Sequence, residues 1–403
     1  MINIEKLRVL SLFSGIGSFE KALTNLGADY NIVGFSEIDE YAIEAYCAIH
    51  KGVKRELNLG DISAIEASDI PDFDLMTYGF PCQDVSAAGL QKGFSEGSET
   101  RSSLLWEAMR VAREKMPKYM IAENVKNLVS KKFKPDFDKW LEELDGMGYN
   151  SYWKVLNAKD YKIPQNRERV FVVSVRKDVD QGFEFPKPFS TTGNLADFLE
   201  EDATLPILHN IYGGFKESKA RVFNEYSPTI RTSSGGGHIP SVVVKGCSLR
   251  TRSYMGQPQK LEVRKDDFSN TVTTVPKDFM VAVFNGKDPV ELSEIIENAS
   301  KIDIKGLKLA VKADGNYRLV KDESDLIENG EYLFIREMTN KEAFRLMGFT
   351  DEDYEIARKA VNDKFYKGRD RSKTRLYGMA GNSIVVNVCE ELFKSLLDFY
   401  PHK

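Results

Sequence analysis

Short apolar runs alternate with amphipathic stretches along the first half of the chain. The runs have the length of buried strands, and the stretches between them repeat apolar residues at helical spacing. This alternation predicts an α/β fold with a doubly wound, mostly parallel sheet and helices on both faces. The predicted strands are 7–13, 32–36, 75–78, 119–122 and 169–175, and the first predicted helices are 19–26 and 41–49.

The pattern of apolar, Gly and Pro residues changes after Phe183. A Pro-containing linker leads into Gly-rich turns between short Val- and Thr-rich segments, which is typical of irregular β structure. Helical spacing returns at 340–347 and 384–400, and the last segment is long and amphipathic enough to pack on the first sheet. We predict an α/β domain at 1–183, a smaller inserted β-rich domain at 184–335, and a return to the first domain at 336–403.

Composition narrows the classes of protein to which this chain can belong. A length of 403 residues suits two domains. Four scattered cysteines without a C-x-x-C pair, and only four histidines, signal neither a disulfide framework nor a metal site. The absence of an eighteen-residue apolar run or a secretory signal favours a cytoplasmic protein without a membrane partner.

The net charge of −5 conceals an uneven distribution. Residues 211–280 contain 11 Lys plus Arg against 6 Asp plus Glu, an excess of five, which leaves −10 on the rest of the chain. Lys and Arg neutralise phosphates when proteins bind nucleic acids. The negative total alone counts weakly against a nucleic-acid partner, but the chain carries a basic segment on an acidic body.

Two glycines stand where the first strand should turn into the first helix. Gly15 and Gly17 permit a tight turn and the close approach of a ligand to the backbone. A dinucleotide fingerprint would place a third glycine at position 20, where Glu20 would repel a pyrophosphate. S-adenosylmethionine has a cationic sulfonium and no phosphate, and suits this loop. An ordinary strand-to-helix turn is the alternative.

Two acids occupy comparable positions further along. Glu37 follows the second predicted strand, and Asp61 comes where a third should end, both at the edge where such sheets bind ligands. A carboxylate accepts hydrogen bonds from ribose hydroxyls or from an adenine amino group. Either acid alone fits a solvated loop, but together with Gly15 and Gly17 they indicate an adenosine pocket.

A cysteine comes soon after the predicted strand 75–78. Pro81 stiffens the chain before Cys82 and polar residues follow it, unlike the setting of a cysteine buried as packing. One reaction that needs such a residue is methylation of cytosine, whose carbon 5 becomes nucleophilic only after addition to carbon 6. A thiolate suits that addition.

Further charged residues follow or begin two other strands. Glu123 closes the run 119–122, and a partly desolvated carboxyl with a raised pKa can protonate or hydrogen-bond ring nitrogen 3 of cytosine. Arg167 and Arg169 alternate, so on an extended chain they point to one face. One can grip the cytosine carbonyl while the other holds the site. A surface salt-bridge cluster is the alternative.

Six motifs, in their order along the chain, resemble those of the bacterial and phage DNA (cytosine-5)-methyltransferases. The matching blocks are Phe13-x-Gly15-x-Gly17, Pro81-Cys82-Gln83, Glu123-Asn124-Val125, Gln165-x-Arg167-x-Arg169, Arg336-Glu337-Met338-Thr339 with Glu342, Arg345 and Met347-Gly348-Phe349, and Gly381-Asn382-Ser383-Ile384-Val385. The resemblance covers residues 7–180 and 336–395. It implies a Rossmann-like, S-adenosylmethionine-dependent catalytic domain, with the segment between as a target-recognition domain.

The resemblance assigns roles position by position. It makes Cys82 the nucleophile, places Glu123 at ring nitrogen 3 and the amino group, and has Arg167 and Arg169 order the site, with Arg169 nearest the cytosine carbonyl. Ile38 stands where many relatives place an aromatic residue under the adenine, which weakens stacking. The residues implied for the cofactor pocket are Phe13, Gly15, Ile16, Gly17, Glu37, Ile38, Asp61, Ile62, Pro81, Leu104, Asn382 and Ser383.

The implied substrate is double-stranded DNA with the target cytosine flipped out of the helix. Residues 86–101 are the expected lid over the flipped base. Residues 229–237 resemble the glycine-loop region of family recognition domains, and 271–274 are a second candidate. The residues implied for DNA contact are Gln83, Ser86, Arg101, Thr229, Arg231, Gly235, Gly236, Arg250 and Arg252, with Arg264 as a further basic candidate. Solvated loop positions are the alternative for these arginines.

Three other functions compete with DNA methylation. A tRNA cytosine methyltransferase shares the cysteine chemistry, but its Cys-Phe-Thr signature and short recognition region are not found. A non-catalytic DNA-binding regulator conflicts with the joint retention of Cys82, Glu123, Arg167 and Arg169, and a nicotinamide-dependent dehydrogenase conflicts with Glu20. A monomer is expected. The recognised site, the role of 286–330, and the choice between a cognate restriction endonuclease and an orphan phage setting stay open.

Overall fold

The computed structural model describes residues 6–81, 104–189, 193–200, 203–209, 221–230, 240–244, 247–250, 260–263, 284–285, 308–313, 316–320 and 331–397. The chain divides into two compact units. The sheet unit comprises Met1–Thr192 with Phe344–Lys403, and the inserted unit comprises Gly193–Ala343. Both divisions lie several residues C-terminal to the predicted domain boundaries. Among the described residues, no helix has the length and apolar character needed to cross a membrane.

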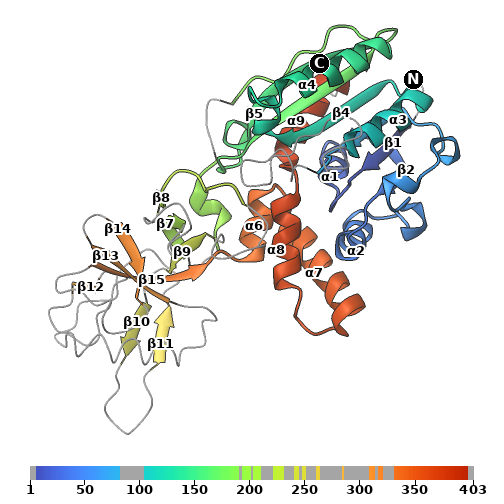
Figure 1. Cartoon of the computed structure of the whole chain (residues 1–403). Coiled ribbons are helices and arrows are strands. Elements are labelled where there is room, and N and C mark those ends of the chain that lie inside the picture. Colours follow the sequence, from blue (N-terminus) through green and yellow to red (C-terminus); the bar gives the residue numbers. More distant parts are fainter. Residues whose placement is uncertain are drawn as a thin grey trace. The chain divides into compact units, whose positions relative to one another are not determined.

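A six-stranded sheet in the order β2-β1-β3-β4-β6-β5 forms the centre of the sheet unit (Figure 1). β1 pairs in parallel with β2 and β3, and β3 with β4, whereas β6 runs antiparallel to β4 and β5. The mixed, mostly parallel sheet confirms the predicted fold class. The strands are β1 (Leu7–Leu12), β2 (Tyr30–Ser36), β3 (Leu75–Tyr78), β4 (Tyr119–Val125), β5 (Tyr149–Asn157) and β6 (Glu168–Arg176).

Helices cover this sheet on both faces. Leu10 and Leu12 of β1 belong to a core that includes Met109 of α3 and Trp140 of α4, while Val9, which precedes Leu10 and so points to the opposite face, is equally buried. The helices of this unit are α1 (Ser18–Asn25), α2 (Glu40–Ile49), α3 (Leu105–Lys115), α4 (Lys134–Gly146), α7 (Asp351–Tyr366), α8 (Lys373–Asn382) and α9 (Val386–Leu397).

Two aromatic contacts join helices that are far apart in the sequence. Phe19 of α1 packs edge-on against Phe393 of α9, with ring centroids 6.1 Å apart. Tyr41 of α2 packs against Phe365 of α7 at 4.4 Å. The C-terminal segment is thereby part of the same core as the first strands, as its amphipathic pattern predicts.

The strand predicted to end before Asp61 does not form. Instead, Asn58 makes an isolated parallel bridge to Phe35, Gly60 turns the chain with a φ of 75°, and a 3₁₀-helix follows at Ile62–Ala64. β3 is therefore the third strand along the chain, and the described stretch between β2 and β3 contains no further strand. The Asn58 side chain accepts from the Gly60 amide at 3.2 Å, which supports the turn that replaces the strand.

The inserted unit is built from antiparallel strands. Its larger sheet has the order β14-β13-β15-β9-β7-β8 with β12 paired to β15, and β10 pairs with β11 separately. Two strands, β13 and β14, fall within residues 286–330, which the sequence pattern left unassigned. The strands are β7 (Ala203–His209), β8 (Arg221–Phe223), β9 (Ser241–Val244), β10 (Cys247–Arg250), β11 (Lys260–Val263), β12 (Phe284–Asn285), β13 (Lys308–Ala313), β14 (Asn316–Leu319) and β15 (Glu331–Glu337).

A buried ion pair fastens the end of β15 to α6 (Asn340–Leu346). The Arg336 Nη2 atom lies 2.9 Å from Oε1 of Glu342, whose side chain is fully buried. The same carboxylate accepts from the backbone amides of Thr339 at 2.7 Å and Glu200 at 2.9 Å. Because a buried carboxylate is costly unless paired and hydrogen-bonded, these three donors explain why this acid is tolerated here.

Candidate active site

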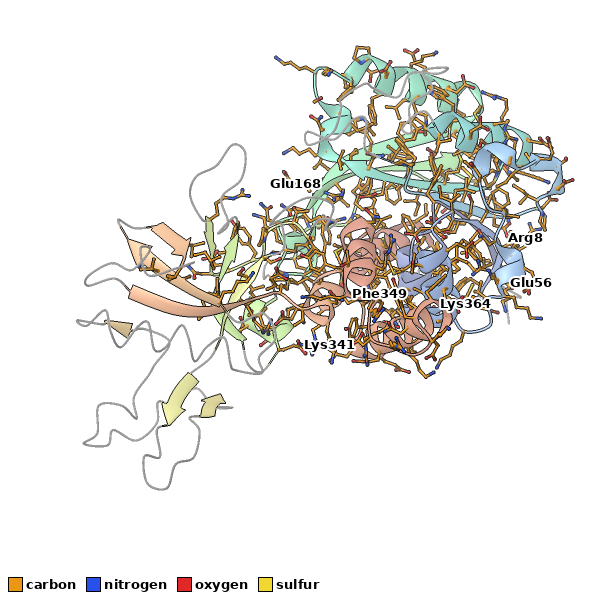
Figure 2. All side chains as sticks on the ribbon, turned by 60° about the horizontal axis from the view of Figure 1, so that its bottom comes forward. Arg8, Glu56, Glu168, Lys341, Phe349 and Lys364 are labelled. Atoms are coloured by element: carbon orange, nitrogen blue, oxygen red, sulfur yellow. The ribbon has the colours of Figure 1, made fainter. Side chains whose placement is uncertain are left out.

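Polar side chains gather at the edge of the sheet where the parallel strands end. The loops after β1, β2 and β3, the end of β4 and the start of the reversed β6 all meet there. Glu168, the first residue of β6, marks this edge in Figure 2, and Arg8, near the start of β1, marks the opposite edge. This is the edge at which open α/β sheets bind ligands.

The loop after β1 has a left-handed backbone at three positions. Phe13, Gly15 and Gly17 have φ values of 55°, 56° and 81°. Gly17 precedes α1, and its amide donates to the Ser14 carbonyl at 2.9 Å. A Cβ on Gly15 would meet no atom within 4 Å, so space beside it stays open to a ligand. Gly15 is therefore needed for its backbone conformation rather than for lack of room.

A buried histidine supports this loop from within. A Cβ on Gly17 would lie 2.0 Å from Nε2 of His50, so only glycine fits against the ring. The Nε2 atom is 2.9 Å from the Ile16 carbonyl, which can only accept, and the ring nitrogen must therefore donate. Burial lowers the pKa of His50, against the opposing charge of Glu20, and favours a neutral ring. Sequence reasoning missed His50, because nothing local distinguishes it from the end of an ordinary helix.

Glu37 connects the ends of β1 and β2. Its Oε2 atom accepts from the Gly15 amide at 2.9 Å, and its Oε1 atom accepts from the amides of Ile38 and Asp39 at 2.8 and 2.9 Å. The Asn58 side chain holds the Glu37 backbone by two hydrogen bonds, accepting from the Glu37 amide and donating to the Glu37 carbonyl. A carboxylate offers about four acceptor positions, so these three bonds leave capacity for one ligand hydroxyl.

An exposed apolar side chain stands beside this acid. Ile38 is 71% exposed, which leaves an apolar surface in water next to Glu37. Asp61 is also exposed, and hydrogen bonds from the Ser63 hydroxyl and amide lower its pKa, so it stays ionised. The Ile62 side chain is 2% exposed and belongs to the core, so this residue can face a ligand only through its backbone.

The segment after β3 is fixed up to its last described residue, Pro81. Phe80 is buried against Trp140, with ring centroids 5.8 Å apart, and its carbonyl accepts from Nδ2 of Asn124 at 2.9 Å. No role is predicted for Asn124 from the sequence, although it lies in a matched block. The predicted residues Cys82, Gln83, Ser86 and Arg101, and the predicted lid 86–101, lie outside the described residues.

Glu123 and Arg169 form an ion pair across neighbouring strands. Glu123 lies opposite Phe171 and Arg169 opposite Val125, which places both side chains on one face of the sheet. The Arg169 Nε atom is 2.9 Å from Oε1 of Glu123, and the two side chains are 18% and 12% exposed. Burial raises the pKa of Glu123, although the Arg169 and Arg167 charges oppose the shift. This degree of burial rules out the alternative of a solvated surface cluster.

Arg167 has a different environment from Arg169. It is 3% exposed, and its Nη2 atom donates to the carbonyls of Gly381 and Ser383 at 2.9 and 2.7 Å. The fully buried Gln165 likewise donates to the Leu346 carbonyl at 2.7 Å. This block therefore anchors the returning C-terminal segment at the sheet edge.

The end of α8 completes the assembly. Gly79, after β3, has Oε2 of Glu123 and Cδ1 of Ile384 within 3.6 Å of the position that a Cβ would take. Asn382 is exposed and Ser383 is buried, while Leu104 precedes α3 and packs partly on the core. Three separate sequence blocks therefore meet around the Glu123 carboxyl.

The structure locates few of the residues predicted to contact DNA. Thr229 is partly buried in the inserted unit, and Arg250 is the last residue of β10. Arg231, Gly235, Gly236, Arg252 and Arg264, and the alternative segment 271–274, lie outside the described residues. Their roles stay predictions.

Comparison with known proteins agrees with the geometry. Residues 7–398 match the family model of the C-5 cytosine-specific DNA methylase. The chain is 31% identical to the orphan methyltransferase M.SPRI of Bacillus phage SPR, covering 99% of each chain. It is also 31% identical to the type II methyltransferase M2.ScrFI of Lactococcus lactis subsp. cremoris, covering 97% of this chain and 99% of that one.

Solved structures show the same fold at lower identity. A Spodoptera frugiperda DNMT2 variant aligns with a TM-score of 0.56 and 18% identity, covering 97% of this chain and 99% of the other. The Dnmt2 methyltransferase of S. pombe aligns with a TM-score of 0.52 and 21% identity, covering 97% and 98%. At these identities the likeness concerns the fold alone.

Proposed function

Because this chain belongs to the C-5 cytosine-specific DNA methylase family and is a DNA (cytosine-5)-methyltransferase, we propose that it methylates a flipped cytosine in a specific duplex sequence through a covalent Cys82 adduct. One observation carries the proposal. The buried Glu123–Arg169 pair lies at the sheet edge, and Asn124, next to Glu123, also holds the Phe80 carbonyl two residues before Cys82. A nucleophile and an acid would thus be positioned by the same strand end.

In the proposed reaction, Cys82 adds to carbon 6 as a thiolate while Glu123 holds a proton at ring nitrogen 3, so that negative charge does not build up on the ring. Arg169 orients the Glu123 carboxyl and faces the cytosine carbonyl. Arg167 acts as a positioning residue, because its Nη2 atom donates to two backbone carbonyls of the C-terminal segment. Loss of the carbon 5 proton and departure of the Cys82 thiolate then restore the aromatic ring.

The edge formed by the loops after β1 and β2 fits S-adenosylmethionine. Ile38 offers an apolar surface for the adenine, Glu37 has acceptor capacity for a ribose hydroxyl, and Asp61 can accept from the adenine amino group. When bound, the cofactor supplies the electrophilic methyl group that carbon 5 takes up. Phe13, Ile16, Pro81, Leu104, Asn382 and Ser383 complete the proposed pocket.

His50 is expected to matter for cofactor affinity without touching the reacting atoms. His50→Phe fills the ring space but removes the donor to the Ile16 carbonyl, and should raise the dissociation constant for S-adenosylhomocysteine about tenfold. His50→Gln brings an N–H to a similar position and should restore most of the affinity. Calorimetric titration measures both values, and equal affinities for the Phe variant and the wild type would exclude this role.

DNA would be read by the inserted unit, through residues 229–237 together with Arg250 and Arg252. The M.SPRI and M2.ScrFI similarities favour two settings, an orphan phage enzyme or one half of a restriction system with an endonuclease for the same site. We also propose that the protein acts as a monomer in the cytoplasm. If an endonuclease encoded beside this protein cleaves unmethylated host DNA, the protein belongs to a restriction system.

The decisive experiment follows the methyl group. Tritiated S-adenosylmethionine is incubated with the protein and, separately, mixed-sequence duplex DNA or tRNA, and bisulfite sequencing locates the product. Label at cytosines in one DNA context supports the proposal, whereas label on tRNA alone overturns it. Duplex DNA containing 5-fluorocytosine should trap a denaturant-stable adduct, because the fluorine cannot leave as a proton does. Peptide mapping should find that adduct on Cys82.

A further inference from the structure

The C-terminal half of α7, the connection that follows it (367–372) and the first turn of α8 together carry a dense positive charge that the catalytic proposal does not use. Residues 358–375 contain eight Lys or Arg and two Asp, in a chain whose net charge is −5. Lys364, Lys367, Arg369, Arg371, Lys373 and Arg375 are all exposed. Figure 1 shows this connection beyond the end of α7, and Lys364 is labelled in Figure 2.

Neither aspartate of this segment neutralises the exposed cations at its centre. Asp363 pairs with Lys359 at 2.5 Å, and Asp370 lies 3.4 Å from Arg358. Lys364, Lys367, Arg369 and Arg371 form no ion pair with any residue in the described ranges. Their positive charge therefore stays available to an external anion.

The backbone that carries these cations is held in one conformation. The Gly368 amide donates to the Asn362 carbonyl at 2.9 Å, and the Arg371 amide donates to Oδ1 of Asn362 at 3.0 Å. The Asn362 Nδ2 atom also reaches Asp370 at 3.3 Å. A fixed backbone lowers the conformational entropy lost on binding, which favours a binding surface over a solvated loop.

Two of the cations occupy helix-end positions where other residue types would stabilise the helix better. Lys367 caps α7 with a φ of 53°, where glycine is preferred. Arg371 directly precedes Ser372, the N-terminal cap of α8. The first turn of α8 contains no acidic residue, although the helix dipole favours an acidic residue at this end. The Ser372 hydroxyl at that cap is buried and has no hydrogen-bond partner among the described residues. Helix N-termini of this kind bind phosphate groups.

We infer that the α7–α8 connection, centred on Lys367, Arg369 and Arg371, binds the phosphate backbone of the DNA substrate outside the inserted unit. The inference rests on the DNA methyltransferase function and concerns affinity rather than chemistry. Backbone contacts of this type hold an enzyme on DNA without reading sequence. The segment would therefore add the same increment of affinity for every sequence.

The test is the salt dependence of DNA binding, measured by fluorescence anisotropy with a mixed-sequence 60-base-pair duplex over a range of NaCl concentrations. Each phosphate contact contributes about 0.9 to the slope of log K against log salt. Arg369→Gln with Arg371→Gln should lower the slope by about 1 to 2 and weaken binding about tenfold near 0.15 M salt. The matched control, Lys51→Gln with Lys54→Gln, removes the same charge from another exposed stretch of the sheet unit and should leave the slope unchanged.

Two single variants separate binding from folding. Arg371→Glu should slightly raise the melting temperature, because an acid suits the start of α8, and yet weaken DNA binding. Lys367→Gly should leave the melting temperature nearly unchanged while weakening binding, because relief of the left-handed strain offsets the lost charge at the helix end. Unaltered slopes in all three α7–α8 variants, or an equal loss in the Lys51/Lys54 control, would overturn the inference. The binding assay needs no turnover, so failure of the Cys82 mechanism would leave its result intact.

Discussion

Replacement of Cys82 by serine is expected to lower the rate of DNA methylation by more than about three orders of magnitude, while the affinity for DNA stays close to that of the wild type. The reason is chemical. A thiol gives a useful fraction of thiolate near neutral pH, whereas a serine hydroxyl stays protonated without a strong neighbouring base. The variant should therefore stop at the bound complex and form no adduct with 5-fluorocytosine DNA.

The chain offers a matched control for this experiment. Cys47 lies on α2, half-buried, and burial raises the pKa of its thiol, so it is a poor nucleophile. Cys47→Ser should retain nearly all of the methylation rate. Single-turnover transfer of tritium to duplex DNA measures both variants. Retention of more than about a tenth of the rate in Cys82→Ser, or a comparable loss in Cys47→Ser, would refute a nucleophilic role for Cys82.

The strands of the sheet could be predicted where they are buried on both faces. Such strands appear as continuous apolar runs, and the prediction 75–78 coincides with β3. The edge strand β5 was missed, because Asn150, Ser151 and Lys154 interrupt its apolar residues. Helix α7 was missed for a related reason. Its described buried residues include Asp353 and Asn362, so it lacks a wide apolar stripe.

The residues of the candidate site also divide into those that the sequence predicts and those that it does not. Glu37 and Glu123 were predicted because each follows an apolar run, and the ends of parallel strands share one edge. His50, Asn58 and Asn124 were not assigned roles, because their partners are backbone atoms that only the folded chain brings near. Local sequence thus indicated the groups that carry charge at the edge, but not the polar side chains that hold the loops in place.

Glu123→Gln is expected to lower the single-turnover rate about 10²- to 10⁴-fold and to change its pH dependence. Burial raises the pKa of Glu123, so the wild-type carboxyl keeps a proton to a higher pH than an exposed glutamate does. The wild-type rate should fall as the pH rises through that pKa, because the proton at ring nitrogen 3 is lost. The glutamine variant has no group that titrates there, and its residual rate should lack this limb.

The stability of the same variant separates chemistry from folding. A raised pKa means that the folded chain binds this proton more tightly than the unfolded chain, so the stabilisation is present at low pH and is lost as the pH rises through the folded pKa. Glutamine avoids that loss and keeps an oxygen to accept from Arg169, so the melting temperature near pH 7 should not fall. Glu168→Gln is the control, since it removes an exposed carboxylate paired with Lys126 at the same edge. If Glu168→Gln lost as much rate as Glu123→Gln, the effect would belong to the charge of this edge and not to a proton held at the cytosine ring.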